Sequence, residues 1–362
     1  AAVIAEGAGV PLLVPLSQQS GLDSLGSHVF QLRTIPETQA RILGEYATLV
    51  LGLEHLVVIS PLSDYGWSFE REFARVAMAN GGKIVHSDWY IPNQTKDFRR
   101  VFEEIRAAGF ALMPPPEDSL AVADPLKWTT LDPAQADEAP SLLTELLRGL
   151  EEEEDAAEEE ETEEAPPDSS EIFIDTIDGL VVVVESFADA QTIAPQVAFH
   201  RLETQVLGNE IWYDPEAIRQ MRAGERKYLD STIFVSARQE GSAAARAFVD
   251  NFRKRFQRDP NYAATGYDAA HLLIKGWEQG HRDRVALTDW LTEIDFYEGA
   301  SGIISLAPSN SPRGELILLK IDSGKIRLLG ENDLPAMGVG EEDLPVPELD
   351  LPESELPLDE FE

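Results

Sequence analysis

The chain has 362 residues, 43% of them hydrophobic, which suffices for one large or two medium domains with a sizeable core. It contains no cysteine, which excludes disulfides, thiolate metal sites and cysteine nucleophiles. Its formal net charge is −37, and an acidic surface without a basic stripe disfavours nucleic acid as a partner.

Two segments carry most of the negative charge. Residues 116–170 contain 19 Asp and Glu against two basic residues, and residues 331–362 contain 12 acidic residues and no basic one. The rest of the chain has a net charge of only −8. Because both segments are also punctuated by proline, we expect a disordered acidic insertion and a disordered acidic tail. A role of the insertion in cation binding or docking is the alternative.

The first part of the chain alternates predicted strands and helices. Residues 1–8 fit the end of a helix, 10–14 and 28–32 fit strands, and an amphipathic helix begins at Pro36. The stretch 55–88 then predicts a βαβ unit. In it, the apolar run 56–59 leads through a polar loop into apolar residues with helical spacing, and Gly81 and Gly82 precede a second strand.

The polar loop of this unit, residues 60–65, follows the carboxyl end of its strand. In an open parallel sheet, ligands bind outside the carboxyl ends of the strands. The loop is therefore a candidate for ligand contact.

The pattern continues on the far side of the acidic insertion. We expect helices at 98–108, 188–202, from 215, and at 242–256, 267–279 and 284–294. We expect strands at 180–184, 205–207 and 231–235, followed by antiparallel strands at 302–306, 315–321 and 325–329, with a hairpin turn at 322–324.

The order of these segments resembles that of the type I periplasmic binding proteins, the leucine/isoleucine/valine-binding family, which includes activators of penicillin-binding proteins. The segments that carry the resemblance are SQQSGL, VFQLRT, SDYG, GGKIV, LGNEIW and GYDAAHLL, within about residues 1–110 and 172–330. The resemblance implies an α/β fold with two parallel-sheet lobes joined by hinge crossings. It also implies that the chain begins inside the first lobe, which is then incomplete.

This resemblance sets the expected domain organisation. The end of the first lobe spans 1–33, the second lobe spans 34–112 and 171–236, the acidic insertion spans 113–170, the helices returning to the first lobe span 237–298, the closing strands span 299–330, and the tail spans 331–362.

The resemblance also implies a binding site for an amino acid or a similar small polar ligand. Such a ligand needs donors for its carboxylate, an acid for its ammonium group and aromatic walls. The matching positions are Leu16, Ser17 and Gln18 in the carboxylate-binding loop, Tyr65 and Phe187 as aromatic residues, and Glu210 as the ammonium-binding acid. Gln18 stands where the family commonly has Thr.

Each of these residues also has a purely structural interpretation. Tyr65 can pack under the helix that it begins, Glu210 can be a solvated loop acid, and Ser17 and Gln18 can cap the preceding strand.

We therefore expect a non-catalytic solute-binding module of the ABC-transporter type, in the periplasm or cell envelope, with a membrane permease as partner. The six histidines lack metal-ligand spacing, and neither a nucleophile elbow nor a phosphate-binding glycine loop occurs, so no metal, cofactor or catalysis is expected. No apolar run is long enough for a transmembrane segment. The alternative is a ligand-free scaffold or activator of peptidoglycan synthesis, with a penicillin-binding protein as partner; the substituted carboxylate loop and the long insertion favour it.

Overall fold

The computed structural model describes residues 1–114, 172–237, 242–258, 260, 262–307, 316–330 and 333. The predicted acidic insertion and tail lie almost wholly outside these residues, so the expectation that they are disordered stays a prediction. Residues up to Leu329 form one compact unit.

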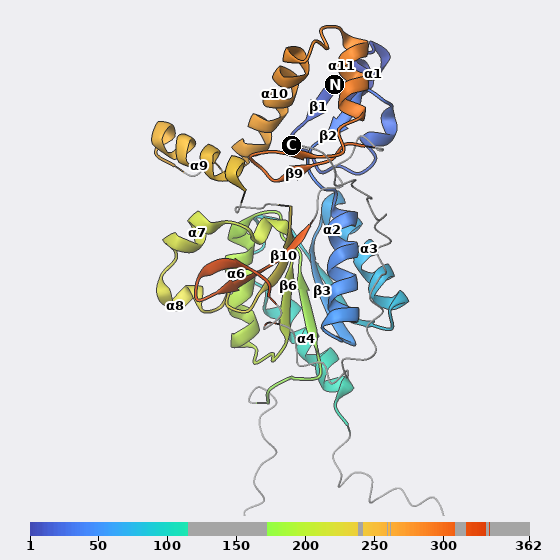
Figure 1. Ribbon diagram of the computed structural model, residues 1–362. Helices are drawn as coiled ribbons and strands as arrows, with labels where there is room; N and C mark the ends of the chain where they lie inside the picture. Colours follow the sequence, from blue (N-terminus) through green and yellow to red (C-terminus); the bar gives the residue numbers. More distant parts are fainter. Residues whose placement is uncertain are drawn as a thin grey trace, which may run out of the picture. The chain divides into compact units, whose positions relative to one another are not determined.

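Seven strands form the larger sheet, in the order β11-β10-β7-β6-β5-β3-β4 (Figure 1). Their bounds are β3 His55–Pro61, β4 Lys83–Tyr90, β5 Gly179–Val182, β6 Gln205–Gly208, β7 Ile233–Ser236, β10 Ile317–Asp322 and β11 Lys325–Leu328. The five strands from β7 to β4 run parallel, whereas β10 is antiparallel to both β7 and β11. The mostly parallel sheet and the predicted hairpin at its edge are thus both confirmed.

Helices cover both faces of this sheet. Their bounds are α2 Pro36–Glu45, α3 Asp64–Ala79, α4 Arg99–Leu112, α6 Phe187–Phe199, α7 Pro215–Gln220 and α8 Ala223–Arg226. Leu56 and Val58 of β3 pack with side chains of α2 and α3, while Val57 and Ile59 pack with those of α4 and α6. Successive strand residues face opposite sides, so a strand covered on both faces requires the uninterrupted apolar run seen in the sequence.

A second, two-stranded parallel sheet pairs β1 (Leu12–Val14) with β2 (Val29–Gln31). Its core joins Phe30 of β2 to Leu272 and Leu291. The other elements of this part are α1 Ala2–Gly7, the 3-10 turn Asp23–Leu25, α9 Ala243–Phe256, α10 Ala263–Glu278, α11 Arg284–Thr292, β8 Tyr297–Glu298 and β9 Ile303–Ile304. The chain passes from β2 into α2 of the larger sheet, returns after β7 with α9, and re-enters the larger sheet at β10.

Two local features differ from the expectation. The helix from Pro36 does not run on regularly, because α2 ends at Glu45 and a π-helical turn, Tyr46–Val50, follows. The predicted strand 302–306 is reduced to β9, which pairs with β8 and does not join the larger sheet.

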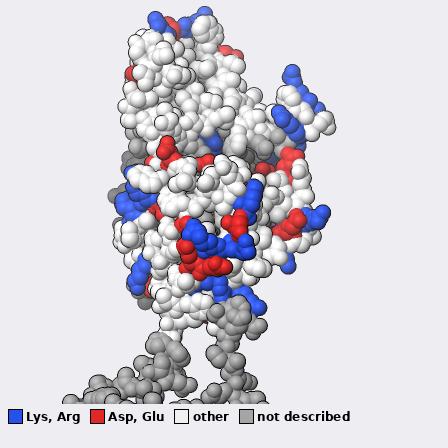
Figure 2. Space-filling model, turned by 180° about the vertical axis from the view of Figure 1, so that it is seen from behind, with Lys and Arg blue, Asp and Glu red and all other residues white. Residues whose placement is uncertain are grey.

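Apolar side chains are exposed on α9 and α10. Phe256, Tyr267, Ile274 and Trp277 are each about half exposed. Figure 2 shows few charged side chains over the part built around the two-stranded sheet, whereas charges of both signs cover the part built on the larger sheet. On the face that Figure 2 shows, charged side chains are therefore sparser over the first part than over the second.

Candidate functional site

A cavity of about 700 Å³ lies at the carboxyl ends of β3 and β5. Residues that line it include Gln18, Arg33, Asp64, Tyr65, Trp67, Glu185 and Tyr262. This is the position at which open parallel sheets bind ligands, and the volume falls within the usual range of small-molecule sites.

The end of β3 and the first turn of α3 build one wall. Ser63 caps α3 by accepting the Gly66 N–H at 3.1 Å, which turns the chain sharply after the strand. Asp64, Tyr65 and Trp67 on the first turn of the helix consequently reach the cavity. The Ser63 hydroxyl also donates to Glu185, directly beyond β5, and so ties two strand ends together.

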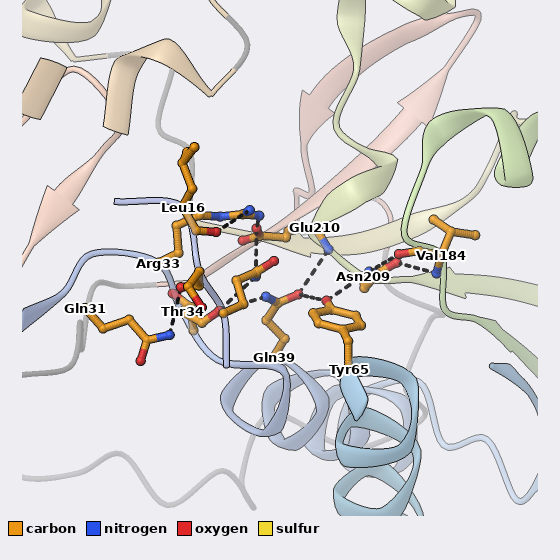
Figure 3. A network of polar contacts seen from close by, with 11 residues as sticks. Leu16, Gln31, Arg33, Thr34, Gln39, Tyr65, Val184, Asn209 and Glu210 are labelled. Carbon is orange, nitrogen blue, oxygen red and sulfur yellow. Dashed lines mark hydrogen bonds and ion pairs between the residues drawn. The ribbon is translucent and has the colours of Figure 1, made fainter. Parts of the chain in front are cut away.

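A buried ion pair joins Arg33 and Glu210 beside the cavity (Figure 3). The two side chains are only 12% and 11% exposed. Gln18 donates to the same Glu210 oxygen at 3.0 Å and to the Thr34 carbonyl at 2.9 Å. The carboxylate expected to bind a ligand ammonium is therefore already neutralised by a guanidinium of the chain itself.

Tyr65 belongs to the same polar network, because Gln39 accepts from the Glu210 N–H at 3.2 Å and donates to the Thr34 carbonyl at 3.3 Å (Figure 3). The Tyr65 hydroxyl donates to the Gln39 oxygen at 3.2 Å and accepts from the Asn209 amide at 2.9 Å. Burial raises the pKa of Tyr65, so the hydroxyl stays protonated and can act as that donor. Asn209 also bonds both the N–H and the carbonyl of Val184, at 3.0 and 2.8 Å. The hydroxyl of Tyr65 is thus bonded within the protein, and the residue also lines the cavity.

The residues predicted from the sequence are only partly brought together. Gln18 and Tyr65 line the cavity, and Glu210 adjoins it through Arg33. Leu16 is exposed, and its carbonyl accepts from Arg33 at 3.4 Å. The Ser17 carbonyl accepts from Gln31 at 2.8 Å. Neither Leu16 nor Ser17 is among the cavity-lining residues.

Phe187 lies apart from this group. It is the first residue of α6, is 8% exposed and packs in the core under one face of the larger sheet. It is not among the residues that line the cavity.

Several cavity residues were absent from the predicted site, among them Arg33, Trp67, Glu185 and Tyr262. A signal existed for Arg33 and Glu185, because each lies just beyond the carboxyl end of a strand. Tyr262, whose ring lies 4.5 Å under the Arg33 guanidinium, comes from the segment before α10, and no local pattern points from there to the cavity.

Among the described residues, one other cluster offers metal-ligand atoms. His86, Asp88 and Glu104 place theirs within 4.8 Å of one another. Arg100, however, donates to Asp88 at 3.1 Å and to Glu104 at 2.6 Å. A permanent cation therefore already bonds to both acids, and we assign no metal to this cluster.

Solved structures with the same architecture include substrate-binding proteins of ABC transporters. The leucine-binding protein LivK of Thermotoga maritima superposes with a TM-score of 0.61 at 15% identity, over 91% of this chain and 75% of that one. LivJ of Streptococcus pneumoniae, in complex with isoleucine, gives 0.59 at 18% identity over 91% and 74%. A solute-binding protein of R. palustris, in complex with benzoate, gives 0.61 at 17% identity over 91% and 72%.

The chain thus has the type I periplasmic binding protein fold, and the fold predicted from the sequence is confirmed. No protein-family model and no curated protein matches the chain. No helix in the described part of the chain is both long and apolar enough to cross a membrane.

Proposed function

We propose that this chain is a non-catalytic solute-binding module that holds a small polar ligand, an amino acid or a molecule of similar size, in the cavity beside Tyr65. The observation that carries the proposal is the cavity of about 700 Å³ at the strand ends, in a fold whose solved neighbours hold isoleucine or benzoate. In this proposal the protein acts in the periplasm or cell envelope and delivers its ligand to a membrane permease.

The cavity offers the mixture of groups that small-ligand sites use. The rings of Tyr65, Trp67 and Tyr262 supply apolar surface, and Gln18 and Glu185 supply directional polar groups. The described residues of the cavity contain neither a histidine nor a cysteine, and the hydroxyl of Ser20 donates to the carboxylate of Glu37 at 2.6 Å in a solvent-exposed hydrogen bond. Binding without chemistry is therefore the function that this lining supports best.

Two tryptophans provide a matched test. Trp67 lines the cavity and Trp277 lies on α10 outside it, and both are 55% exposed. A thermal-shift screen of amino acids, small peptides, aromatic acids and amines, followed by calorimetry, is expected to find a micromolar ligand. Trp67→Ala should then weaken binding about tenfold, because a lost aromatic contact is worth roughly 1 kcal/mol or more.

Trp277→Ala should leave the affinity unchanged. Equal weakening by both substitutions would show that the ligand does not occupy the cavity. If no compound in the screen binds, the solute-binding proposal fails.

A second candidate, the ligand-free scaffold or activator with a penicillin-binding protein as partner, is favoured by one observation. The polar groups of Glu210, Gln18 and Gln39 already bond to one another or to the chain, as in a site that has lost its ligand. A failed ligand screen together with direct binding to a penicillin-binding protein would support this candidate.

A further inference from the structure

We propose that the ligand of the cavity carries an ammonium group, which Asp64 and Glu185 bind in place of Glu210. This inference rests on the solute-binding function proposed above and names the class of solute. It comes from the charges of the residues that line the cavity, and from which of them the protein has already neutralised.

The Arg33–Glu210 pair takes two groups out of ligand recognition. A ligand ammonium could reach Glu210 only by displacing a guanidinium from a pair that is almost nine-tenths buried. A ligand carboxylate could use Arg33 only by leaving the Glu210 carboxylate without its counterion. Breaking a buried pair by removing one partner is strongly unfavourable, so neither exchange is expected.

The remaining charges of the lining are both negative. Arg33 is the only cation among the described residues that line the cavity, and Asp64 and Glu185 are its acids. With Arg33 compensated by Glu210, the described lining residues offer a ligand two carboxylates and no second cation; the nearby Arg71 lies over the Trp67 ring and is not among the lining residues. Like charges repel and opposite charges attract in such a cavity, so it disfavours a monocarboxylate and favours an amine.

Asp64 and Glu185 both line the cavity, at neighbouring strand ends. Asp64 begins α3 directly after Ser63, and the Ser63 hydroxyl bonds to Glu185, so the two acids belong to adjoining strand ends. An ammonium group has three donors and can bond both carboxylates at once. Trp67, on the first turn of the same helix, adds apolar surface beside them; the Arg71 guanidinium lies 4.6 Å over its ring, so the ammonium assignment depends on the two carboxylates and not on this ring.

A set of ligands that share one hydrocarbon group but differ in the charge of the head group provides the test. Leucinamide, leucine and 4-methylpentanoate share the isobutyl group and carry a positive, a zwitterionic and a negative head group; benzylamine and benzoate form a second pair. In calorimetry on the full chain at low salt, we expect leucinamide to bind at least tenfold tighter than 4-methylpentanoate, and benzylamine at least tenfold tighter than benzoate. Added salt should narrow both gaps, because it screens exposed charges.

Three variants test whether the preference for amines depends on Asp64 and Glu185. Glu185→Gln and Asp64→Asn should each weaken amine binding about tenfold while retaining a polar side chain of similar shape. Glu72→Gln, on the same helix but paired with Arg75, is the control and should leave amine binding unchanged.

Tighter binding of the carboxylates, or amine binding that both site variants leave unchanged, would overturn the ammonium assignment while leaving the solute-binding function intact. The assignment is equally wrong if the broader screen finds a solute and neither amine binds. If no solute of any charge binds, the proposed function itself fails.

Discussion

The Arg33–Glu210 ion pair connects the segment after β2 to the segment after β6, so it contributes to stability as well as to the character of the cavity. Arg33→Met would leave a buried carboxylate without its counterion. We expect it to lower the free energy of unfolding by about 3 kcal/mol, measured by chemical denaturation.

The double variant Arg33→Met/Glu210→Gln removes the uncompensated charge together with its partner, and we expect it to recover most of the loss. A double-mutant cycle measures the coupling directly. A loss below about 1 kcal/mol for Arg33→Met would show that the pair behaves like an exposed one.

At the scale of residues, the sequence predicted which side chains lie near the cavity better than it predicted which side chains bond to one another. Gln18 and Tyr65 reach the cavity because they follow strand ends, which is a local property visible in the sequence. The pairing of Arg33 with Glu210 depends on how segments far apart in the chain meet, and no local pattern encodes it. The same limit applies to Asn209, which is fully buried and holds Val184 and Tyr65 through its amide.

Among the elements, α3 shows how closely a helix can approach the end of its strand. A Cβ atom on Gly66 would lie 2.1 Å from the Pro61 carbonyl oxygen, and backbone cannot move aside as a side chain can. We expect Gly66→Ala to lower the free energy of unfolding by about 2 to 3 kcal/mol, the usual cost of overpacking.

Gly266 on α10 is the matched control. A Cβ atom added there would have nothing within 4 Å, and an alanine in a helix is favoured over glycine by about 0.5 to 1 kcal/mol. Gly266→Ala should therefore stabilise the protein slightly. Equal effects of the two substitutions in denaturation experiments would contradict the close approach at Gly66.

Two glutamates of α3 should make the free energy of unfolding depend on pH in opposite directions. Burial raises the pKa of Glu70, which accepts from Ser87, whereas the hydrogen bond from Arg75 lowers the pKa of Glu72; the ordinary value of both is 4.5. An acid whose pKa is raised in the folded state lowers the free energy of unfolding as the pH rises above its ordinary pKa, because its charged form is disfavoured in the folded protein. Below the ordinary pKa the acid is protonated in both states, and this penalty is absent. A lowered folded-state pKa stabilises above the ordinary value, and this contribution is lost as pH falls through the folded-state pKa.

At pH 7, Glu70→Gln should therefore be more stable than the parent protein, and Glu72→Gln less stable by a few tenths of a kcal/mol. Both differences should shrink as the pH is lowered through the ordinary value of 4.5 and below it. Chemical denaturation of the parent protein and the two variants between about pH 3 and 8 measures these differences in the free energy of unfolding. If both differences change with pH in the same direction, the burial of Glu70 or the ion pair of Glu72 is not as described.

The elements themselves were largely predictable because their signals are local. Ser63 before a helical pattern, Pro36 at a first turn, and the apolar run of β3 each determine an element boundary or a buried face from a few neighbouring residues. The π-helical turn Tyr46–Val50 and the two-residue strand β8 escaped prediction. Neither has a distinctive pattern, and β8 is defined by its pairing with β9.

For the whole molecule, the described residues show where the long acidic segment leaves the fold and where the chain returns. Arg106 near the end of α4 donates to the Ile172 carbonyl at 3.0 Å, and the Thr176 hydroxyl donates to the Gly109 carbonyl at 2.7 Å. The second half of α4 therefore contacts the first described residues beyond the segment, and we expect a short connection to be able to replace what lies between them.

We expect replacement of residues 115–170 by a short Gly/Ser linker to leave the free energy of unfolding unchanged or to raise it by up to about 2 kcal/mol. The reason is that the entropic cost of closing a loop grows only with the logarithm of its length, so a roughly tenfold shorter loop saves little. Tm and chemical denaturation measure the change. A Gly/Ser segment of the native length is the control, and it should match the parent protein, because loop length is then the same and only sequence differs. If both replacements lower Tm by more than about 10 °C, the acidic segment packs against the rest of the protein and contributes to its stability.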